Sequence, residues 1–279
     1  MIGKSRSHSK NSDAGSSTSR LAGICCFLFD MDGTICLDDQ LLPGAHELLA
    51  FLNANGVPFY FITNNSSRSR REYALKLSRL GLSYGEERIF TSGEATAIYL
   101  RRWKAQARLF VVGTPSLEEE MTNAGFVLVQ EKPDAIVLGF DTTLTYGKLQ
   151  RLCDLVRSGT PYFATHPDIN CPTETGFIPD IGATMAFVEA STGRKPDIVI
   201  GKPNQPMVEA IVEKTGIPAE AMAMVGDRLY TDIAMGQSGL ITILVLSGET
   251  HLEDVQASEY KPDFIFRDLA DFLKIYRTI

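Results

Sequence analysis

Residues 24–34 read ICCFLFDMDGT, an apolar run that ends in two aspartates. The run at 24–29 predicts a short, fully buried strand, so Asp30 and Asp32 follow directly at its end. Because side chains two residues apart on an extended chain point the same way, both carboxylates can face one pocket. Two carboxylates this close resist joint ionisation unless a cation lies between them. The stretch therefore predicts a Mg²⁺ site in which one carboxylate attacks phosphorus and the other transfers a proton.

Three more segments place polar residues directly after a predicted strand. Asp-Gly alone also marks ordinary turns, so these segments decide between a turn and a site. In an open parallel sheet the C-terminal ends of the strands lie together at one edge, where ligands bind. The segments are Thr63, Asn64 and Asn65 after a strand at 58–62, Gly201, Lys202 and Pro203 after a strand at 198–200, and Gly226 and Asp227 after a strand at 221–225, with Thr231 and Asp232 close behind.

The four segments, in this order, resemble the four motifs of the haloacid dehalogenase superfamily of phosphohydrolases, over the chain from about Leu21 onward. The spacing is most similar to the branch that contains the N-acetylglucosamine-operon phosphatases, the 4-nitrophenylphosphatases, and the phosphoglycolate and pyridoxal phosphate phosphatases. The resemblance implies a Mg²⁺-dependent phosphatase that hydrolyses a small-metabolite phosphomonoester through an aspartyl-phosphate. Sugar phosphates, nucleoside monophosphates, phosphoglycolate and pyridoxal phosphate are the expected substrate classes.

The aspartates receive distinct roles. Asp30 is the candidate nucleophile, and Asp32 is the general acid that protonates the leaving alkoxide and then the base that deprotonates water. Asp227 is expected to bind Mg²⁺ together with the Asp30 carboxylate and the backbone carbonyl of Asp32. For Asp232, support of the metal or of the lysine and direct ligation both stay open, because an acidic residue at a helix start is also favoured by the helix dipole.

The remaining motif residues are candidates for phosphate binding. Thr63 and Asn64 can donate hydrogen bonds to the phosphoryl oxygens, and Lys202 adds a positive charge over the same group. Arg228 and Thr231 lie beside the expected metal site and are candidates for substrate contact. Taken singly, these residues would form a turn and a solvated lysine; their order after predicted strands favours the site.

The spacing of the motifs predicts two domains. From Leu21 the chain alternates predicted strands and helices, as in an α/β fold with a Rossmann-like parallel sheet. The interval between Thr63 and Lys202 is long enough for a domain of its own, with strands expected at 109–112, 135–138 and 162–164. We therefore expect a catalytic core at 21–96 and 198–279, divided by an inserted α/β cap domain at 97–197. In the family this cap resembles the type placed between the second and third motifs.

Two helices of the core have predicted ends. Pro43 can start a helix that Gly56 ends in the left-handed conformation. Ser66 or Ser67 can cap a second helix that stops at Gly81.

The cap loop contains His166 and Asp168, where relatives of this branch more often carry Asn in place of the histidine. This departure concerns the substrate and not the core chemistry. An exposed loop histidine is more often incidental than functional, so both readings stay open for His166. Asp168 is the stronger candidate for substrate contact.

The composition of the chain limits the kinds of binding partner that we expect. The net charge of −7 argues against a nucleic-acid surface, and no run of 18 apolar residues supports a membrane span. The five cysteines form no zinc pattern and fit reduced thiols in a cytoplasmic protein; Cys25 and Cys26 are expected in the core. Residues 1–20 are rich in Ser, Lys and Arg and predict a disordered tail, with a targeting segment as the alternative. The expected partner is a small phosphorylated metabolite, and a homo-oligomer is possible.

Two other activities stay open beside a phosphatase. One is a phosphotransferase on the same core, and the other is a phosphate-binding or regulatory module without turnover. Such a module would normally lack a motif residue, and all four motifs are complete here. A dehalogenase is disfavoured because its chemistry needs no second aspartate at position 32.

Overall fold

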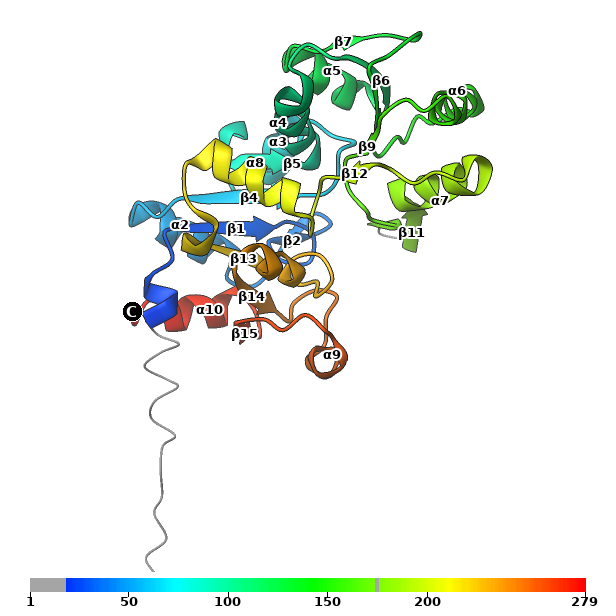
Figure 1. Cartoon of the computed structure of the whole chain (residues 1–279). Helices are drawn as coiled ribbons and strands as arrows, with labels where there is room; N and C mark the ends of the chain where they lie inside the picture. The colour runs from blue at the N-terminus through cyan, green and yellow to red at the C-terminus, as the bar shows by residue number, and fades with distance from the viewer. Residues whose placement is uncertain (1–18, 174–175) are drawn as a thin grey trace, which may run out of the picture.

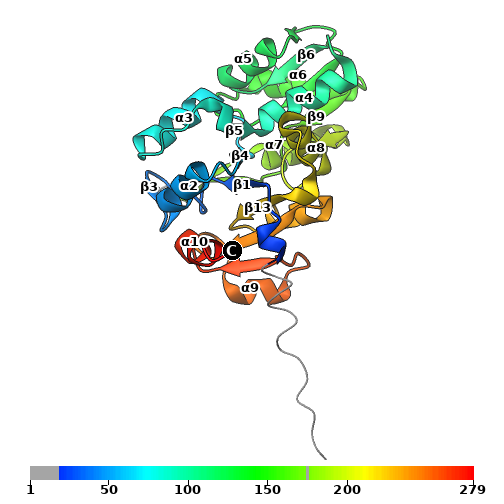
Figure 2. The ribbon, with the colours of Figure 1, turned by 90° about the vertical axis from the view of Figure 1, so that its left-hand side faces the viewer.

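The chain forms two parallel sheets that lie one above the other (Figures 1 and 2). The computed structural model describes residues 19–173 and 176–279. The larger sheet is the core sheet, and its six strands are all parallel. In spatial order they are β15 (Phe264–Phe266), β14 (Ile241–Val245), β13 (Met222–Gly226), β1 (Cys26–Asp30), β4 (Phe59–Thr63) and β5 (Ile89–Thr91). The predicted α/β class is confirmed.

The central strand β1 is buried on both faces, which explains its unbroken apolar sequence. Phe27 and Phe29 point to one face and pack in one cluster with residues of α2 (Ala45–Ala54), α3 (Arg70–Arg79) and α10 (Leu269–Tyr276). Leu28 points to the other face and packs with residues of α4 (Ser92–Lys104) and α8 (Gln205–Thr215). Each such buried side chain stabilises the fold by about 1.5–3 kcal/mol, so β1 is held firmly where Asp30 begins the site.

The second sheet is the cap sheet, with five parallel strands inserted between β5 and β13 of the core. Its order is β12 (Ile198–Val199), β9 (Tyr162–Ala164), β8 (Ala135–Leu138), β6 (Arg108–Val112) and β7 (Val127–Leu128). One face packs with α6 (Tyr146–Arg157) and α7 (Ile181–Thr192), and α5 (Pro115–Asn123) packs beside α4. The other face shares a hydrophobic cluster with α4, α8 and the core sheet, so the two sheets have a continuous apolar contact.

The strand before Lys202 differs from its prediction. We expected residues 198–200 to form a core strand, but β12 pairs with β9 of the cap sheet. Its short apolar sequence fits a buried strand of either sheet, and only long-range pairing decides which. The division into a core at 21–96 and 198–279 and a cap at 97–197 stays a prediction, and β12 lies just beyond its second boundary.

The helix ends are partly as predicted. The helix α2 follows Pro43, and Gly56 has the expected positive φ of 66°. The cap of α3 is Ser69, not Ser66 or Ser67, because its hydroxyl accepts from the backbone N–H of Glu72 in a capping box. The Ser66 hydroxyl instead accepts from the backbone N–H of Phe140 at 2.9 Å.

Several smaller elements complete the fold. Two antiparallel hairpins, β2 (Cys36–Leu37) with β3 (Gln40–Leu41) and β10 (Asn170–Thr173) with β11 (Gly176–Pro179), follow β1 and β9. The short helix α9 (Leu252–Ala257) and the 3₁₀ turns η1 (Glu86–Arg88) and η3 (Ile233–Ser238) lie between core strands, and the 3₁₀ turn η2 (Ala219–Ala221) precedes β13. Neither hairpin was predicted. Cys26 is buried as expected, but Cys25 is exposed, so its expected place in the core is wrong.

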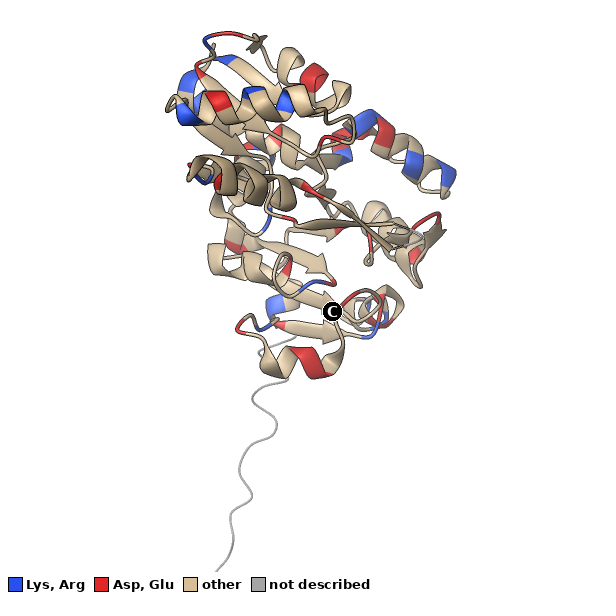
Figure 3. Cartoon of the chain, turned by 90° about the vertical axis from the view of Figure 1, so that its right-hand side faces the viewer, with Lys and Arg blue, Asp and Glu red and all other residues tan. Residues whose placement is uncertain are grey.

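Charged residues are spread over both parts of the molecule, and several helices carry both signs in the view of Figure 3. Within residues 19–173 and 176–279, every helix is too short or too polar to cross a bilayer. Of the tail expected at 1–20, residues 1–18 lie outside the described residues, whereas Ser19 and Arg20 begin a helical turn.

Candidate active site

The C-terminal ends of β1, β4 and β13 meet at one edge of the core sheet and form an inner pocket. Its volume is about 40 Å³, which leaves room for little beyond a phosphoryl group. Seven of the predicted site residues line it together: Asp30, Asp32, Thr63, Asn64, Lys202, Arg228 and Thr231. Asp168 lines it from the cap. The predicted convergence of the motifs is therefore found in the structure.

The buried Lys202 ammonium lies between two carboxylates. Its Nζ is 2.5 Å from Asp30 Oδ1 and 2.6 Å from Asp232 Oδ1. Burial raises the pKa of Asp30 to about 8 against the lysine's opposing effect, and the charges of Asp232 and Asp227 add to the rise. Burial alone would lower the pKa of Lys202, but the two carboxylates outweigh it and raise the pKa. The lysine therefore stays charged, and its single charge does not neutralise the carboxylates around it.

Asp227 is fixed by the two loops that flank it. Its Oδ2 accepts from the backbone N–H of Glu249 at 2.7 Å, and its Oδ1 accepts from the Thr34 hydroxyl at 3.3 Å. Gly33, at φ +91°, and Gly248 both press against this carboxylate so closely that neither position has room for a Cβ. Burial first, and Asp232 second, raise the pKa of Asp227 to about 6.

These carboxylates fit a hard divalent cation. Asp30, Asp227 and Asp232 each offer an oxygen within 4.8 Å of the others. Burial and the neighbouring carboxylates raise the pKa values of Asp30 and Asp227, and a cation bound by their oxygens would favour the ionised forms. Asp232 uses both of its oxygens already, one on Lys202 and one accepting from the backbone N–H of Arg228 at 3.1 Å.

Asp32 lies at the mouth of the pocket, with its side chain 44% exposed. Its Oδ1 accepts from Lys76 Nζ at 3.0 Å. Lys76 lies on α3 and was not predicted. Its sequence carries no motif signal, because its place beside Asp32 depends on how α3 packs against the sheet.

Asn64 contacts the backbone of Lys202 and the cap. Its Oδ1 accepts from Lys202 N at 2.8 Å, and its Nδ2 donates to Lys202 O at 3.0 Å and to Asp168 Oδ1 at 2.9 Å. The side-chain amide therefore holds the lysine's backbone, and its direct bond to a phosphoryl oxygen stays a prediction.

Arg228 and Thr231 follow β13 on the loop that carries Asp232. The guanidinium Nε of Arg228 is 3.0 Å from Glu249 Oε2 but lacks hydrogen-bond geometry to it. The Thr231 side chain is buried. Both residues line the inner pocket as predicted, and their contacts with substrate stay predictions.

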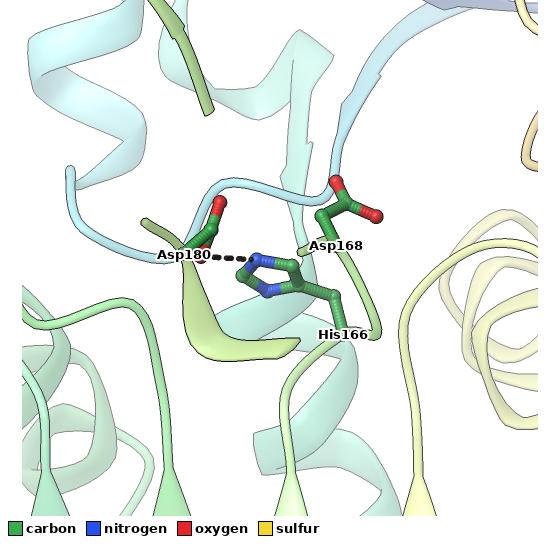
Figure 4. Close-up of side chains that lie close together, drawn as sticks. All are labelled: His166, Asp168 and Asp180. Carbon is green, nitrogen blue, oxygen red and sulfur yellow. Dashed lines mark hydrogen bonds and ion pairs between the residues drawn. The ribbon is translucent and has the colours of Figure 1, made fainter. Parts of the chain in front are cut away.

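His166 is fully buried, so its expected place in an exposed loop is wrong. Figure 4 shows its ring directed at Asp180, with Nε2 at 3.1 Å from Asp180 Oδ1. Its Nδ1 lies 3.0 Å from Thr165 Oγ1 and 3.5 Å from the Ser92 hydroxyl. Both ring nitrogens therefore have polar neighbours within the protein. His166 does not line the inner pocket.

The cap contributes residues that sequence reasoning missed. Asn170, Cys171 and Pro172 of β10 and Asp180 line the inner pocket beside Asp168. Asp180 also caps α7, since its Oδ1 accepts from Ile181 N at 2.5 Å. An acidic residue before an apolar helix was the available signal for Asp180. The residues of β10 gave none, because their position depends on an unpredicted hairpin.

Two protein-family models match separate parts of this chain. The family model described as haloacid dehalogenase-like hydrolase matches residues 27–127, and a second, described as HAD-hydrolase-like, matches residues 199–272. These ranges contain all four motifs.

Individual relatives extend the similarity across the cap. A dihydroxyacetone phosphatase of Corynebacterium glutamicum is 33% identical over 88% of this chain and 89% of its own length. An acid sugar phosphatase of Staphylococcus aureus is 36% identical over 87% of this chain and 94% of its own length. The crystal structure of a 4-nitrophenylphosphatase from Thermotoga maritima has a TM-score of 0.88 and 49% identity, covering 91% of this chain and 98% of that one.

Proposed function

The chain belongs to the haloacid dehalogenase-like hydrolases, as a phosphoric monoester hydrolase of the 4-nitrophenylphosphatase branch, and we propose that it removes phosphate from a small metabolite through an Asp30 phosphoenzyme. The observation that carries this proposal is the bond of one buried ammonium, Lys202, to both Asp30 and Asp232 at the sheet edge where the motifs meet.

Asp30 is the nucleophile in this proposal. Lys202 occupies its Oδ1, so we assign the in-line attack on phosphorus to Oδ2. The P–O bond to the leaving group breaks as the new P–O bond to Asp30 forms. Water then attacks the aspartyl-phosphate, which releases inorganic phosphate and restores the carboxylate.

Asp32 transfers the protons. As an acid it protonates the departing alkoxide, and as a base it later takes the proton from the attacking water. Its exposed position at the pocket mouth and its contact with Lys76 support this role on the leaving-group side.

Asp30, Asp227 and the backbone carbonyl of Asp32 would hold Mg²⁺, with Asp232 orienting Lys202. When bound, the ion supplies the positive charge that the carboxylates lack and balances the charge of the transferring phosphoryl group. Lys202, Thr63, Arg228 and Thr231 complete the set of donors around the phosphoryl oxygens. Asn64 holds the backbone of Lys202 and thereby positions its ammonium group.

The substrate is a small-metabolite phosphomonoester. The names of the relatives, dihydroxyacetone phosphatase, acid sugar phosphatase and 4-nitrophenylphosphatase, support this chemistry and span different leaving groups. A non-catalytic phosphate-binding module or a phosphotransferase on the same core is the alternative.

The test is hydrolysis by the purified full chain. With Mg²⁺ it should release phosphate from 4-nitrophenyl phosphate and from at least one metabolite ester, and chelation should stop both reactions reversibly. Well-folded protein that releases no phosphate would overturn the proposal. Transfer of the phosphoryl group to an added alcohol at the expense of water would favour the phosphotransferase.

A further inference from the structure

A second and much larger pocket opens beside the inner pocket. This outer pocket has a volume of about 600 Å³, against about 40 Å³ for the inner one. Five residues line both: Asp168, Asn170, Pro172, Arg228 and Thr231. Because these shared residues make the two pockets adjoin, the outer pocket can take the rest of a substrate whose phosphoryl group lies in the inner one.

The walls of the outer pocket are mainly apolar and include two exposed aromatic side chains. Phe177, on β11 of the cap, is 74% exposed, and Tyr230, on the core loop after β13, is 53% exposed. Ile169 is 66% exposed, and Val199 and Pro203 also line the pocket. Large apolar side chains gathered around an open pocket mark a binding surface, because burying them stabilises a complex.

Polar side chains also line the outer pocket, Asp168 and Asn170 from the cap and Asn204, Arg228, Thr231 and Glu249 from the core, and several already have partners: Asp168 accepts from Asn64, and Asn204 donates to Gly201 O. The Tyr230 hydroxyl donates to Glu249 Oε1 at 2.9 Å, and Arg228 faces the same carboxylate. A polyol would have to compete for these engaged groups, and each buried hydroxyl left without a partner would cost about 1–3 kcal/mol. A flat ring would instead gain apolar contact and stacking of about 0.5–1.5 kcal/mol per aromatic partner.

We propose that the outer pocket binds an aromatic or heteroaromatic ring in the leaving group, and that Phe177 and Tyr230 determine this specificity. This inference rests on the phosphatase proposal and names its substrate class. The enzyme accordingly prefers phosphate esters with a ring close to the ester oxygen over triose and open-chain polyol phosphates.

The test compares benzyl phosphate with glycerol 3-phosphate, whose leaving groups are both primary alkoxides. The wild-type chain with Mg²⁺ should have a kcat/KM at least tenfold higher for benzyl phosphate. Phe177→Ser in the cap and Tyr230→Ser in the core should each lower that ratio fivefold or more, mainly through KM for benzyl phosphate. The matched control is Phe187→Ser, an exposed phenylalanine on α7 outside the pocket, which should leave the ratio unchanged.

The other outcomes distinguish failure of the ring-pocket proposal from failure of the phosphatase proposal. Equal or better turnover of glycerol 3-phosphate by the wild type would overturn the ring pocket while leaving the phosphatase proposal intact. The same holds if both wall variants keep the wild-type ratio. Hydrolysis of neither ester, nor of the wider panel of metabolite esters, would overturn the phosphatase proposal itself.

Discussion

The side-chain amide of Asn64 holds both backbone polar groups of Lys202. It accepts from the lysine N–H at 2.8 Å and donates to the lysine carbonyl at 3.0 Å, although 138 residues separate the two positions. The same lysine contacts the proposed nucleophile through Nζ. The position of the catalytic charge therefore depends on an asparagine that needs no contact with substrate.

Replacing Asn64 by Ala should remove this support. The two buried backbone groups of Lys202 would lose their partners, so we expect a loss of about 1–3 kcal/mol in the free energy of unfolding. Turnover should fall at least tenfold, mostly in kcat. Chemical denaturation and steady-state kinetics measure the two effects. Asn55→Ala, an exposed asparagine just after α2 whose amide donates to Phe51 O, is the control. Unchanged kcat in Asn64→Ala would contradict the positioning role.

Asp30→Asn should abolish turnover while the fold and phosphate binding persist. An amide keeps the shape of the carboxylate but cannot attack phosphorus, so kcat should fall on the order of 10³-fold or more. Steady-state assays with 4-nitrophenyl phosphate, and calorimetric titration with inorganic phosphate, check the two halves of this statement. A variant that keeps a tenth of wild-type kcat would refute Asp30 as the nucleophile.

Asp32→Asn should act selectively on esters with poor leaving groups. Alkyl phosphates need a proton on the departing oxygen, whereas 4-nitrophenolate leaves almost without one. The ratio of kcat for 4-nitrophenyl phosphate to kcat for glycerol 3-phosphate should therefore rise at least tenfold in the variant. Equal losses on both esters would argue against the acid role.

His166→Asn should lower turnover of every substrate by a similar factor. The ring is buried between Asp180 and Thr165, so the shorter side chain leaves buried polar groups unpaired and destabilises the fold by about 1–3 kcal/mol. Asp168→Ala serves as the contrasting variant. It removes a side chain that lines both pockets, so it should change the ratio of kcat/KM between metabolites.

The control for the histidine variant is His46→Asn, on the exposed side of α2. A change of selectivity in His166→Asn would restore the substrate contact as its role.

Glu120 should make stability depend on pH. Burial first, and the charge of Glu94 second, raise its pKa from 4.5 to about 7 in the folded chain. Because the folded pKa lies above the unfolded one, its stabilising contribution is complete below about pH 4.5 and is lost as pH rises through 7. Glu120→Gln should remove this loss, making the variant more stable than the wild type by about 1–3 kcal/mol at pH 8. Thermal unfolding from pH 5 to 8, with exposed Glu119→Gln as control, measures it; parallel curves would contradict the assignment.

The sequence predicted which motif residues lie together better than it predicted the tertiary contacts around them. The motif aspartates and Thr63 lie at the edge of the core sheet, and Lys202, which follows β12 of the cap sheet, reaches them there. Their positions were predictable because each follows an apolar run, which is a local signal. His166, by contrast, owes its burial to Asp180, which lies 14 residues further along a chain that must first form a hairpin. Lys76 reaches Asp32 only through the packing of α3. These contacts depend on tertiary pairing, which no local pattern encodes.

Because β12 belongs to the cap sheet, it limits where natural or engineered recombination can exchange the cap of this protein. A chimera joined just before Ile198 would pair the incoming β9 with a β12 from the other parent, whose side chains come from a different sheet. A chimera joined after Val199 would keep the sheet whole, but the graft would then end three residues before the lysine that contacts Asp30. Any exchange of specificity between relatives must therefore also preserve the position of a catalytic charge.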